Sequence, residues 1–306
     1  MSQPGPAPTQ PSQGELNPKR WVILGVLVVS LLVVVLDNTV LNVALPTIGR
    51  DLGATQEQLV WSINSYTCVF AAMLFTWGVL GDRDGRKRIL MIGLTLFGLA
   101  SLLTAYAQTP EQLIVFRGIM GFGGASVLPV TLAIITVVFP PHERGKAIGM
   151  WAAAVGAAVA IGPVLGGFLI EHFWWGSVFL INVPIVVVGV ILIAMLVPES
   201  KNPKPGRLDP LGVVLSVTGL LLLTYGILHG GDTREWGSVR VLGPTLVGLL
   251  LIVSFVLIEW RSDHPSLDLT LFKIRSFTVS LTAVTLAFAA MTGTLIFLTF
   301  YLQVVR

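Results

Sequence analysis

Long apolar stretches separated by short polar segments form the pattern of this chain. Nine stretches are about 20 residues or longer, the length of helix that crosses the hydrocarbon core of a bilayer. Their apolar residues run on without the alternation of barrel strands. Because only helices and closed barrels span membranes, the pattern predicts an all-α polytopic membrane protein. The predicted spans are residues 21–45, 58–80, 88–106, 111–139, 146–170, 177–197, 210–229, 240–260 and 277–303.

The composition agrees with this pattern and excludes other classes. Only 11% of the residues are charged, against about 25% in soluble domains. The basic residues lie in short loops rather than on one soluble face, which argues against nucleic acid as a partner. If the N-terminus is cytoplasmic, 14 of the 19 Lys and Arg residues lie on the cytoplasmic side and 4 outside. The positive-inside rule therefore predicts a cytoplasmic N-terminus.

The chain carries few groups for enzymatic chemistry. One cysteine, Cys68, excludes a disulfide framework or a thiolate metal site. The four histidines are far apart, and no set of nucleophile and base is visible. We expect neither an enzyme nor a bound cofactor.

The two ends of the chain differ from the spans. Residues 1–20 are rich in Pro, Gln and Ser, which predicts a disordered tail. The sequence stops as the ninth span ends. From the odd number of spans without a closing loop, we expect a shortened chain that lacks the second half of a larger bundle.

Two charged residues interrupt the apolar spans. Asp37 lies about 24 Å above the inner boundary of the first span, at 1.5 Å per residue. Arg117 lies about 6 Å below the outer boundary of the fourth span, which is the same depth in a core about 30 Å thick. Ionisable residues at membrane depth are functional candidates, so we predict that Asp37 and Arg117 are coupled. Two alternatives stay open: Asp37 only pins two helices together, or Arg117 only reaches the outer interface.

The segment GVLGDRDGRKR, residues 78–88, is the most specific motif. Glycines before the loop allow close helix approach, and Gly85 permits a turn with positive φ. The segment resembles the loop motif of the major facilitator superfamily, which implies a cytoplasmic latch between two halves of a transporter. The latch residues would be Gly78, Gly81, Asp82, Arg83, Gly85, Arg86 and Lys87.

The segments GMWAAAVGAAVAIGPVLGGFL (149–169) and HFWWGSVFLINVPI (172–185) resemble motifs of the fourteen-span drug:proton antiporter branch of that family, and above all of its exporters of quaternary ammonium compounds. The resemblance implies a six-helix bundle (21–197) after a cytoplasmic tail (1–20). A loop with two linker helices (198–260) and the first helix of a second bundle (261–306) would follow. The resemblance also links Arg117 to proton transfer and implies that protons are the coupling ion. An antiporter motif in the fifth span would comprise Gly156, Gly162, Pro163, Gly166 and Gly167.

The resemblance implies a proton-coupled antiporter that exports lipophilic or cationic drugs or biocides across the bacterial inner membrane. A buried carboxylate holds either a proton or a lipophilic cation, since burial favours its neutral form and a cation its charged form. We expect Asp37 to alternate in this way, in a monomer surrounded by lipid. Candidates for the substrate cavity are Asn38 and Asn42, and the rings of Tyr66 and Phe70 through their π faces. Two alternatives stay open. The protein exports an endogenous metabolite, antibiotic or lipid, or the chain is a fragment that transports nothing.

Overall fold

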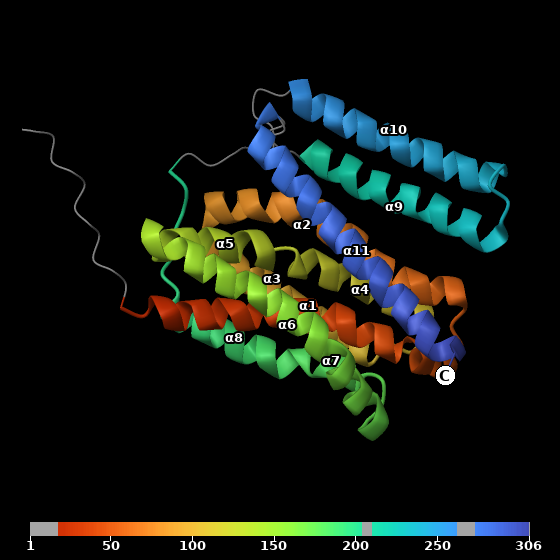
Figure 1. Cartoon of the computed structure of the whole chain (residues 1–306), viewed down its shortest axis with the longest axis horizontal. Helices are drawn as coiled ribbons and strands as arrows, with labels where there is room; N and C mark the ends of the chain where they lie inside the picture. The colour runs from red at the N-terminus through yellow and green to blue at the C-terminus, as the bar shows by residue number, and fades with distance from the viewer. Residues whose placement is uncertain (1–17, 204–209, 262–272, 306) are drawn as a thin grey trace, which may run out of the picture.

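The computed structural model describes residues 18–203, 210–261 and 273–305, and these segments are helical apart from turns and connections. Helices α1 to α8 lie side by side along one direction, and α11 crosses them diagonally (Figure 1). The helices are α1 (Arg20–Leu52), α2 (Gln56–Asp84), α3 (Arg86–Ala105), α4 (Pro110–Gly124), α5 (Val127–Val138), α6 (Pro141–His172), α7 (Ser177–Leu180), α8 (Asn182–Leu196), α9 (Pro210–Thr233), α10 (Val239–Arg261) and α11 (Arg275–Val305).

Eight helical segments among the described residues are long and apolar enough to cross a membrane. They coincide with the first eight predicted spans, which confirms the all-α polytopic fold class. The segment predicted as a ninth span is helix α11. The predicted tail, apart from its last three residues, lies outside the described part of the chain.

Two of the predicted spans are broken into two helices. The fourth span is formed by α4 and α5, and the sixth by α7 and α8. Pro129 lies four residues after the break at Ala125, and Pro184 lies three residues after the break at Ile181. A proline has no N–H for the carbonyl four residues before it, and its ring collides with that carbonyl. The prolines therefore account for both interruptions.

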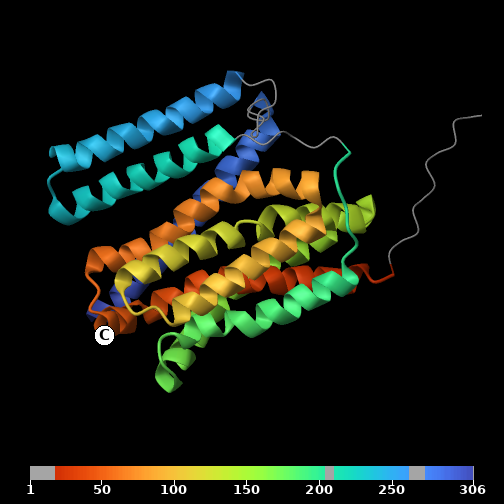
Figure 2. The same ribbon diagram turned by 180° about the vertical axis from the view of Figure 1, so that it is seen from behind.

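The six spans formed by α1 to α8 pack into one bundle, and α9 and α10 form an antiparallel hairpin on its flank (Figure 2). The hairpin contacts α2 through α9. There the Cys68 thiol lies 3.3 Å from the hydroxyl of Thr224, and the Trp61 ring lies 6.1 Å from the Tyr225 ring. The described helices thus form a bundle of six spans with a helical hairpin beside it.

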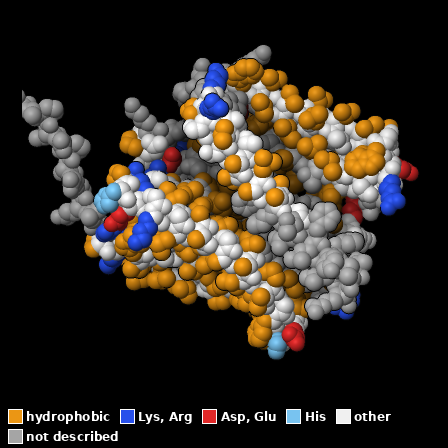
Figure 3. All heavy atoms as spheres, viewed as in Figure 1, with side chains coloured by type: hydrophobic (Ala, Val, Ile, Leu, Met, Phe, Trp, Pro, Cys, Tyr) orange, Lys and Arg blue, Asp and Glu red, His pale blue; other side chains and the backbone are white. Residues whose placement is uncertain are grey.

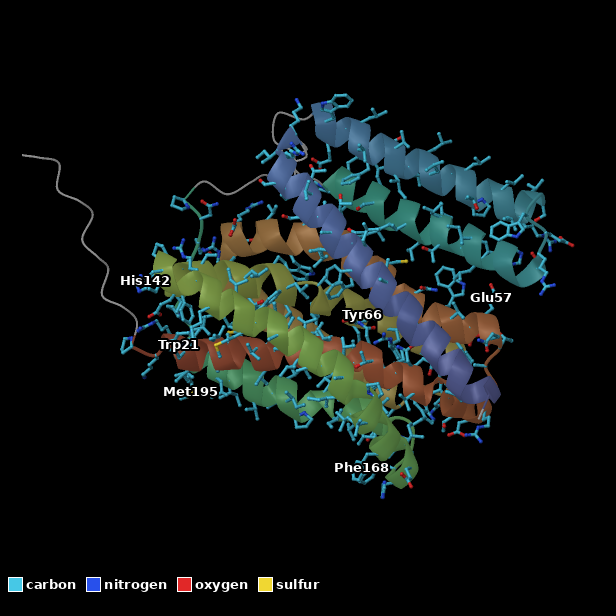
Figure 4. The ribbon with its side chains drawn as sticks, in the orientation of Figure 1. Trp21, Glu57, Tyr66, His142, Phe168 and Met195 are labelled. Carbon is cyan, nitrogen blue, oxygen red and sulfur yellow. The ribbon has the colours of Figure 1, made fainter. Side chains whose placement is uncertain are left out.

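The distribution of side chains identifies the two ends of the bundle. Trp21, His142 and Met195 lie at one end, and Glu57 and Phe168 lie at the other (Figure 4). Apolar side chains cover the flank seen in Figure 3, whereas charged side chains gather at the ends. This is the surface of a protein embedded in a bilayer with its loops in water.

Candidate functional site

Asp37 lies on the buried face of α1. Buried residues recur there at helical spacing, with Val33, Val34, Val40 and Leu41 beside the carboxyl group. The Asp37 side chain is almost fully enclosed, with 2% of its surface exposed. An ionised carboxylate is stable at such a position only if partners replace the water that it loses.

Arg117 of α4 supplies the first partner. Its Nη1 donates to Oδ2 of Asp37, forming an ion pair in which both side chains are enclosed. Its Nη2 donates to Oδ1 of Asn38 at 3.0 Å, and its Nε donates to the carbonyl of Ser62 at 3.1 Å. The guanidinium carbon lies 4.2 Å from the centre of the Tyr66 ring. All three guanidinium nitrogens are therefore bonded, and the charge also faces a π system.

Glycines let α4 bring Arg117 this far into the bundle. A Cβ added at Gly121 would lie 3.0 Å from the Cα of Tyr66, and one at Gly123 would lie 2.6 Å from the carbonyl oxygen of Gly93. Any side chain at these positions would push α4 away from α2 and α3. The Arg-Gly-rich segment thus fixes the depth and the direction of the arginine.

The second partner of Asp37 is Asn182, the first residue of α8. Its Nδ2 donates to Oδ1 of Asp37 at 3.0 Å and to Oγ of Ser101 in α3 at 3.1 Å. The Ser101 hydroxyl in turn donates to the carbonyl of Phe179 at 2.8 Å. The carboxylate is therefore held from two sides, by Arg117 on one oxygen and by Asn182 on the other.

Other predicted cavity residues lie beside this cluster. Tyr66 is buried beneath Arg117, and Phe70 stacks on it at 5.5 Å between ring centres. The Asn42 side chain donates to its own helix, at the carbonyl of Asn38, 3.0 Å away. The structure thus brings Asp37, Asn38, Tyr66 and Arg117 together, whereas the Asn42 side chain reaches only the backbone of Asn38.

The predicted latch motif joins the end of α2 to the start of α3. Gly85 has a φ of 118°, which permits the turn between the two helices as the sequence indicated. Arg86 pairs with Asp82 at 2.8 Å, whereas Arg83 lies 3.7 Å from Asp84 in an exposed position. Gly81 faces Val130 of α5, where an added Cβ would lie 3.0 Å away.

The segment that follows α8 folds back onto this motif. Glu199 accepts from the backbone N–H groups of Lys87 at 3.1 Å and Arg88 at 3.2 Å, at the start of α3. The backbone N–H of Asn202 donates to the carbonyl of Asp82 at 2.8 Å, and the Lys87 ammonium donates to the carbonyl of Ala194 at 2.6 Å. A carboxylate at a helix N-terminus bonds free N–H groups and complements the helix dipole.

The glycines of α6 divide into two groups. Gly162 faces the side chain of Thr39, and an added Cβ at Gly166 would lie 3.1 Å from the carbonyl oxygen of Val40. These two glycines, four residues apart, let α6 pack closely against α1 beside Asp37. Gly156 and Gly167 have no described atom within 4 Å of an added Cβ, and Pro163 lies within the helix directly after Gly162.

Sequence reasoning missed Asn182, Ser101 and Glu199. The signal for Asn182 was present. It lies five residues into a span that begins near residue 177, so its depth is about 8 Å below the outer boundary, close to that of Arg117. A polar amide at that depth points to the same layer of the membrane.

A bundle of six membrane helices, with an ion pair enclosed at membrane depth and a flanking helical hairpin, defines a polytopic membrane protein with a charged site in its interior. The family model described as Major Facilitator Superfamily matches residues 27–305, and the chain belongs to this family. Among solved structures, the peptide transporter POT matches 78% of this chain and 52% of its own, with a TM-score of 0.59 at 13% identity, which supports the fold alone.

Curated relatives include efflux and resistance proteins. The multidrug efflux pump LfrA of Mycolicibacterium smegmatis is 38% identical over 296 residues, which cover 96% of this chain and 58% of LfrA. The methyl viologen resistance protein SmvA of Salmonella typhimurium is 40% identical over 277 residues, which cover 89% of this chain and 54% of SmvA. The chain spans about half the length of the curated relatives it matches.

Proposed function

We propose that this chain belongs to a proton-coupled antiporter that exports lipophilic cationic drugs or biocides across the bacterial plasma membrane. The observation that carries the proposal is the enclosed pair of Asp37 and Arg117. The relatives support the class of cargo, since one is a multidrug efflux pump and another a methyl viologen resistance protein.

The chemistry of exchange follows from the exclusion of water. The enclosed Asp37 carboxylate requires a positive partner, and three are available in turn: Arg117, a proton and a substrate cation. The carboxylate carries a single negative charge, so Arg117, a proton and a substrate cation compete for it. A proton entering from outside therefore displaces a bound cation outward, and loss of the proton to the inside readies the site for the next cation.

The remaining residues support this cycle. Asn38 holds Arg117 near Asp37 through its hydrogen bond. The Tyr66 ring, stacked on Phe70, forms the aromatic surface against which the guanidinium lies. Asn42, also on α1, contacts the substrate once Arg117 has separated from Asp37. Gly162 and Gly166 provide a close-packed surface on which α6 moves against α1.

The cytoplasmic side is assigned from the distribution of Lys and Arg, which puts the N-terminus and the latch motif there. The network of Asp82, Arg86 and Glu199 acts as the latch on this half of the protein. In this organisation, residues 21–197 form the transport bundle and 198–260 the loop and linker helices. Residues 261–306 begin a second bundle, and the working unit is a monomer in lipid.

The test is transport of tetraphenylphosphonium, a lipophilic cation, into inside-out membrane vesicles that contain the protein. An imposed proton gradient drives uptake in the wild type, and Asp37→Asn abolishes the dependence on the gradient. Ser30→Ala is the matched control. Ser30 is also enclosed on α1, but its hydroxyl bonds only its own helix, at the carbonyl of Val26 2.9 Å away. Gradient-driven uptake at the wild-type rate in Asp37→Asn refutes the proposal.

A further inference from the structure

Asn182 contacts Asp37 on the side opposite to Arg117. Its side chain is enclosed, with 2% of its surface exposed, at the break between α7 and α8. Nδ2 of Asn182 donates to Oδ1 of Asp37, and Nη1 of Arg117 donates to Oδ2. The two carboxylate oxygens thus have different donors from different helices.

The hydrogen bonds around Asn182 fix which way its amide faces. Ser101 has one hydroxyl proton, and that proton goes to the carbonyl of Phe179. The Ser101 oxygen can then only accept, so the group of Asn182 that faces it must be the NH₂ group. The same NH₂ group directs its other proton at Oδ1 of Asp37. With two N–H bonds and two acceptors, the orientation is fully determined.

This orientation directs where a proton binds. A proton on Oδ1 would weaken the bond from the Asn182 N–H, because a hydroxyl oxygen is a poorer acceptor than a carboxylate or carbonyl oxygen, whereas Oδ2 becomes available when Arg117 withdraws. We infer that Asn182 is a positioning residue that directs protonation of Asp37 to Oδ2, the oxygen that Arg117 occupies, so that proton uptake is coupled to release of Arg117. The inference rests on the proposed function and specifies why a proton and a substrate cation do not occupy Asp37 together.

The step is a simple exchange of donors. The bond from Nη1 of Arg117 to Oδ2 breaks, and a bond between the proton and Oδ2 forms. The guanidinium stays charged and keeps its bonds to Asn38 and Ser62 and its contact with the Tyr66 ring. Asn182 keeps its bond to Oδ1 throughout, because the protonated carboxyl still accepts there.

The surroundings contain few competing charges. Arg117 and Tyr66 are the ionisable groups that face Asp37 from the described helices. Helices α5, α7 and α8 carry no ionisable side chain. Those of α3 are confined to its first three residues, and those of α6 to its first six and last two. Among the described helices, the pH dependence of cation binding is therefore assigned to Asp37.

Loss of the Asn182 amide would remove this preference. Oδ1 could then take the proton while Oδ2 still accepts from Arg117. The neutral carboxyl would keep a partner on each oxygen, and proton uptake would no longer be coupled to release of Arg117. Proton and cation would still influence each other, but with a finite coupling instead of strict competition.

The experiment measures binding of tetraphenylphosphonium to the purified protein in lipid nanodiscs across a series of pH values. Strict competition lowers the wild-type affinity about tenfold for each pH unit below the midpoint, without levelling off. In Asn182→Leu, whose side chain branches at the same atom but donates no hydrogen bond, the affinity is expected to level off as the pH falls. A purely structural role would change the affinity equally at every pH.

Thr104→Val is the matched control. Thr104 lies one turn after Ser101 on α3 and is fully enclosed, and its hydroxyl bonds the carbonyl of Ala100 at 2.7 Å. This variant should keep the steep wild-type dependence. If Asn182→Leu does not fold, Asn182→Ala is judged by the same criterion.

The outcomes separate this inference from the proposed function. An equally steep dependence in the Asn182 variant overturns the inference and leaves the proposed function standing. A wild-type affinity that does not change with pH, or a steep dependence that persists in Asp37→Asn, overturns both. Levelling in the Asn182 variant alone supports the inference.

Discussion

The pair of Asp37 and Arg117 makes an asymmetric prediction about stability. Asp37→Asn leaves the Arg117 charge enclosed without a counter-charge, and arginine cannot lose its proton to relieve this. Arg117→Met leaves a carboxyl group, which becomes neutral by taking up a proton. We therefore expect Asp37→Asn to be the more destabilising change, and only the effect of Arg117→Met to diminish as the pH is lowered.

The magnitude follows from the enclosure of both side chains, of which 0% and 1% is exposed. Removing one member of a buried ion pair costs about 3–5 kcal/mol. With about 2–4 °C per kcal/mol for a large domain, Asp37→Asn should lower Tm by roughly 6–20 °C. The double variant removes both charges and should be less destabilised than Asp37→Asn alone.

The chain contains its own probe for this measurement. Cys68 is its one cysteine, and 9% of the side chain is exposed where α2 meets α9. A dye that becomes fluorescent on reaction with a thiol therefore reports unfolding during a temperature ramp. A double variant whose loss in Tm equals the sum of the two single losses would refute the reasoning, as would an Arg117→Met variant that is the less stable one at acidic pH.

Two further predictions concern packing and the latch, both measured with the same thiol assay. Gly166→Val places a side chain against Val40 of α1 and should cost about 1–3 kcal/mol, whereas its neighbour Gly167→Val, which has open space, should stay within about 0.5 kcal/mol of wild type. Equal losses in the two valine variants would contradict the assigned α1–α6 contact. Glu199→Ala removes the acceptor for two N–H groups at the start of α3 and should cost about 1 kcal/mol, while Glu235→Ala, at an exposed position, serves as control. An unchanged Tm in Glu199→Ala would show that the cap does not stabilise α3.

Most of the fold could be predicted from the sequence because a bilayer leaves few choices. The length of the apolar stretches alone locates the eight spans. The breaks at Ala125 and Ile181 were not predicted, since apolar length does not register a proline three or four residues further on. The depth of Asp37 and Arg117 could be counted along their helices, and the structure joins these two side chains.

The partners on the other side of the site were not predictable by the same reasoning. Ser101 looks like any small residue in a helix of the bundle, and only the packing of α3 against α8 brings it to Asn182. Glu199 appeared to be one charge in a loop, because the return of the chain after α8 to the start of α3 depends on tertiary structure. Depth along a helix is encoded locally, whereas the direction in which a side chain points depends on its neighbours.

The central claim is that Asp37 holds a proton and a substrate cation in turn. The most direct test is the number of protons released when tetraphenylphosphonium binds to the purified protein in weakly buffered solution, measured across a pH series. The account predicts that release rises from none toward one proton per bound cation as the pH falls through the midpoint of Asp37, and that it disappears in Asp37→Asn. Release that is absent at every pH, or that persists in Asp37→Asn, would contradict it.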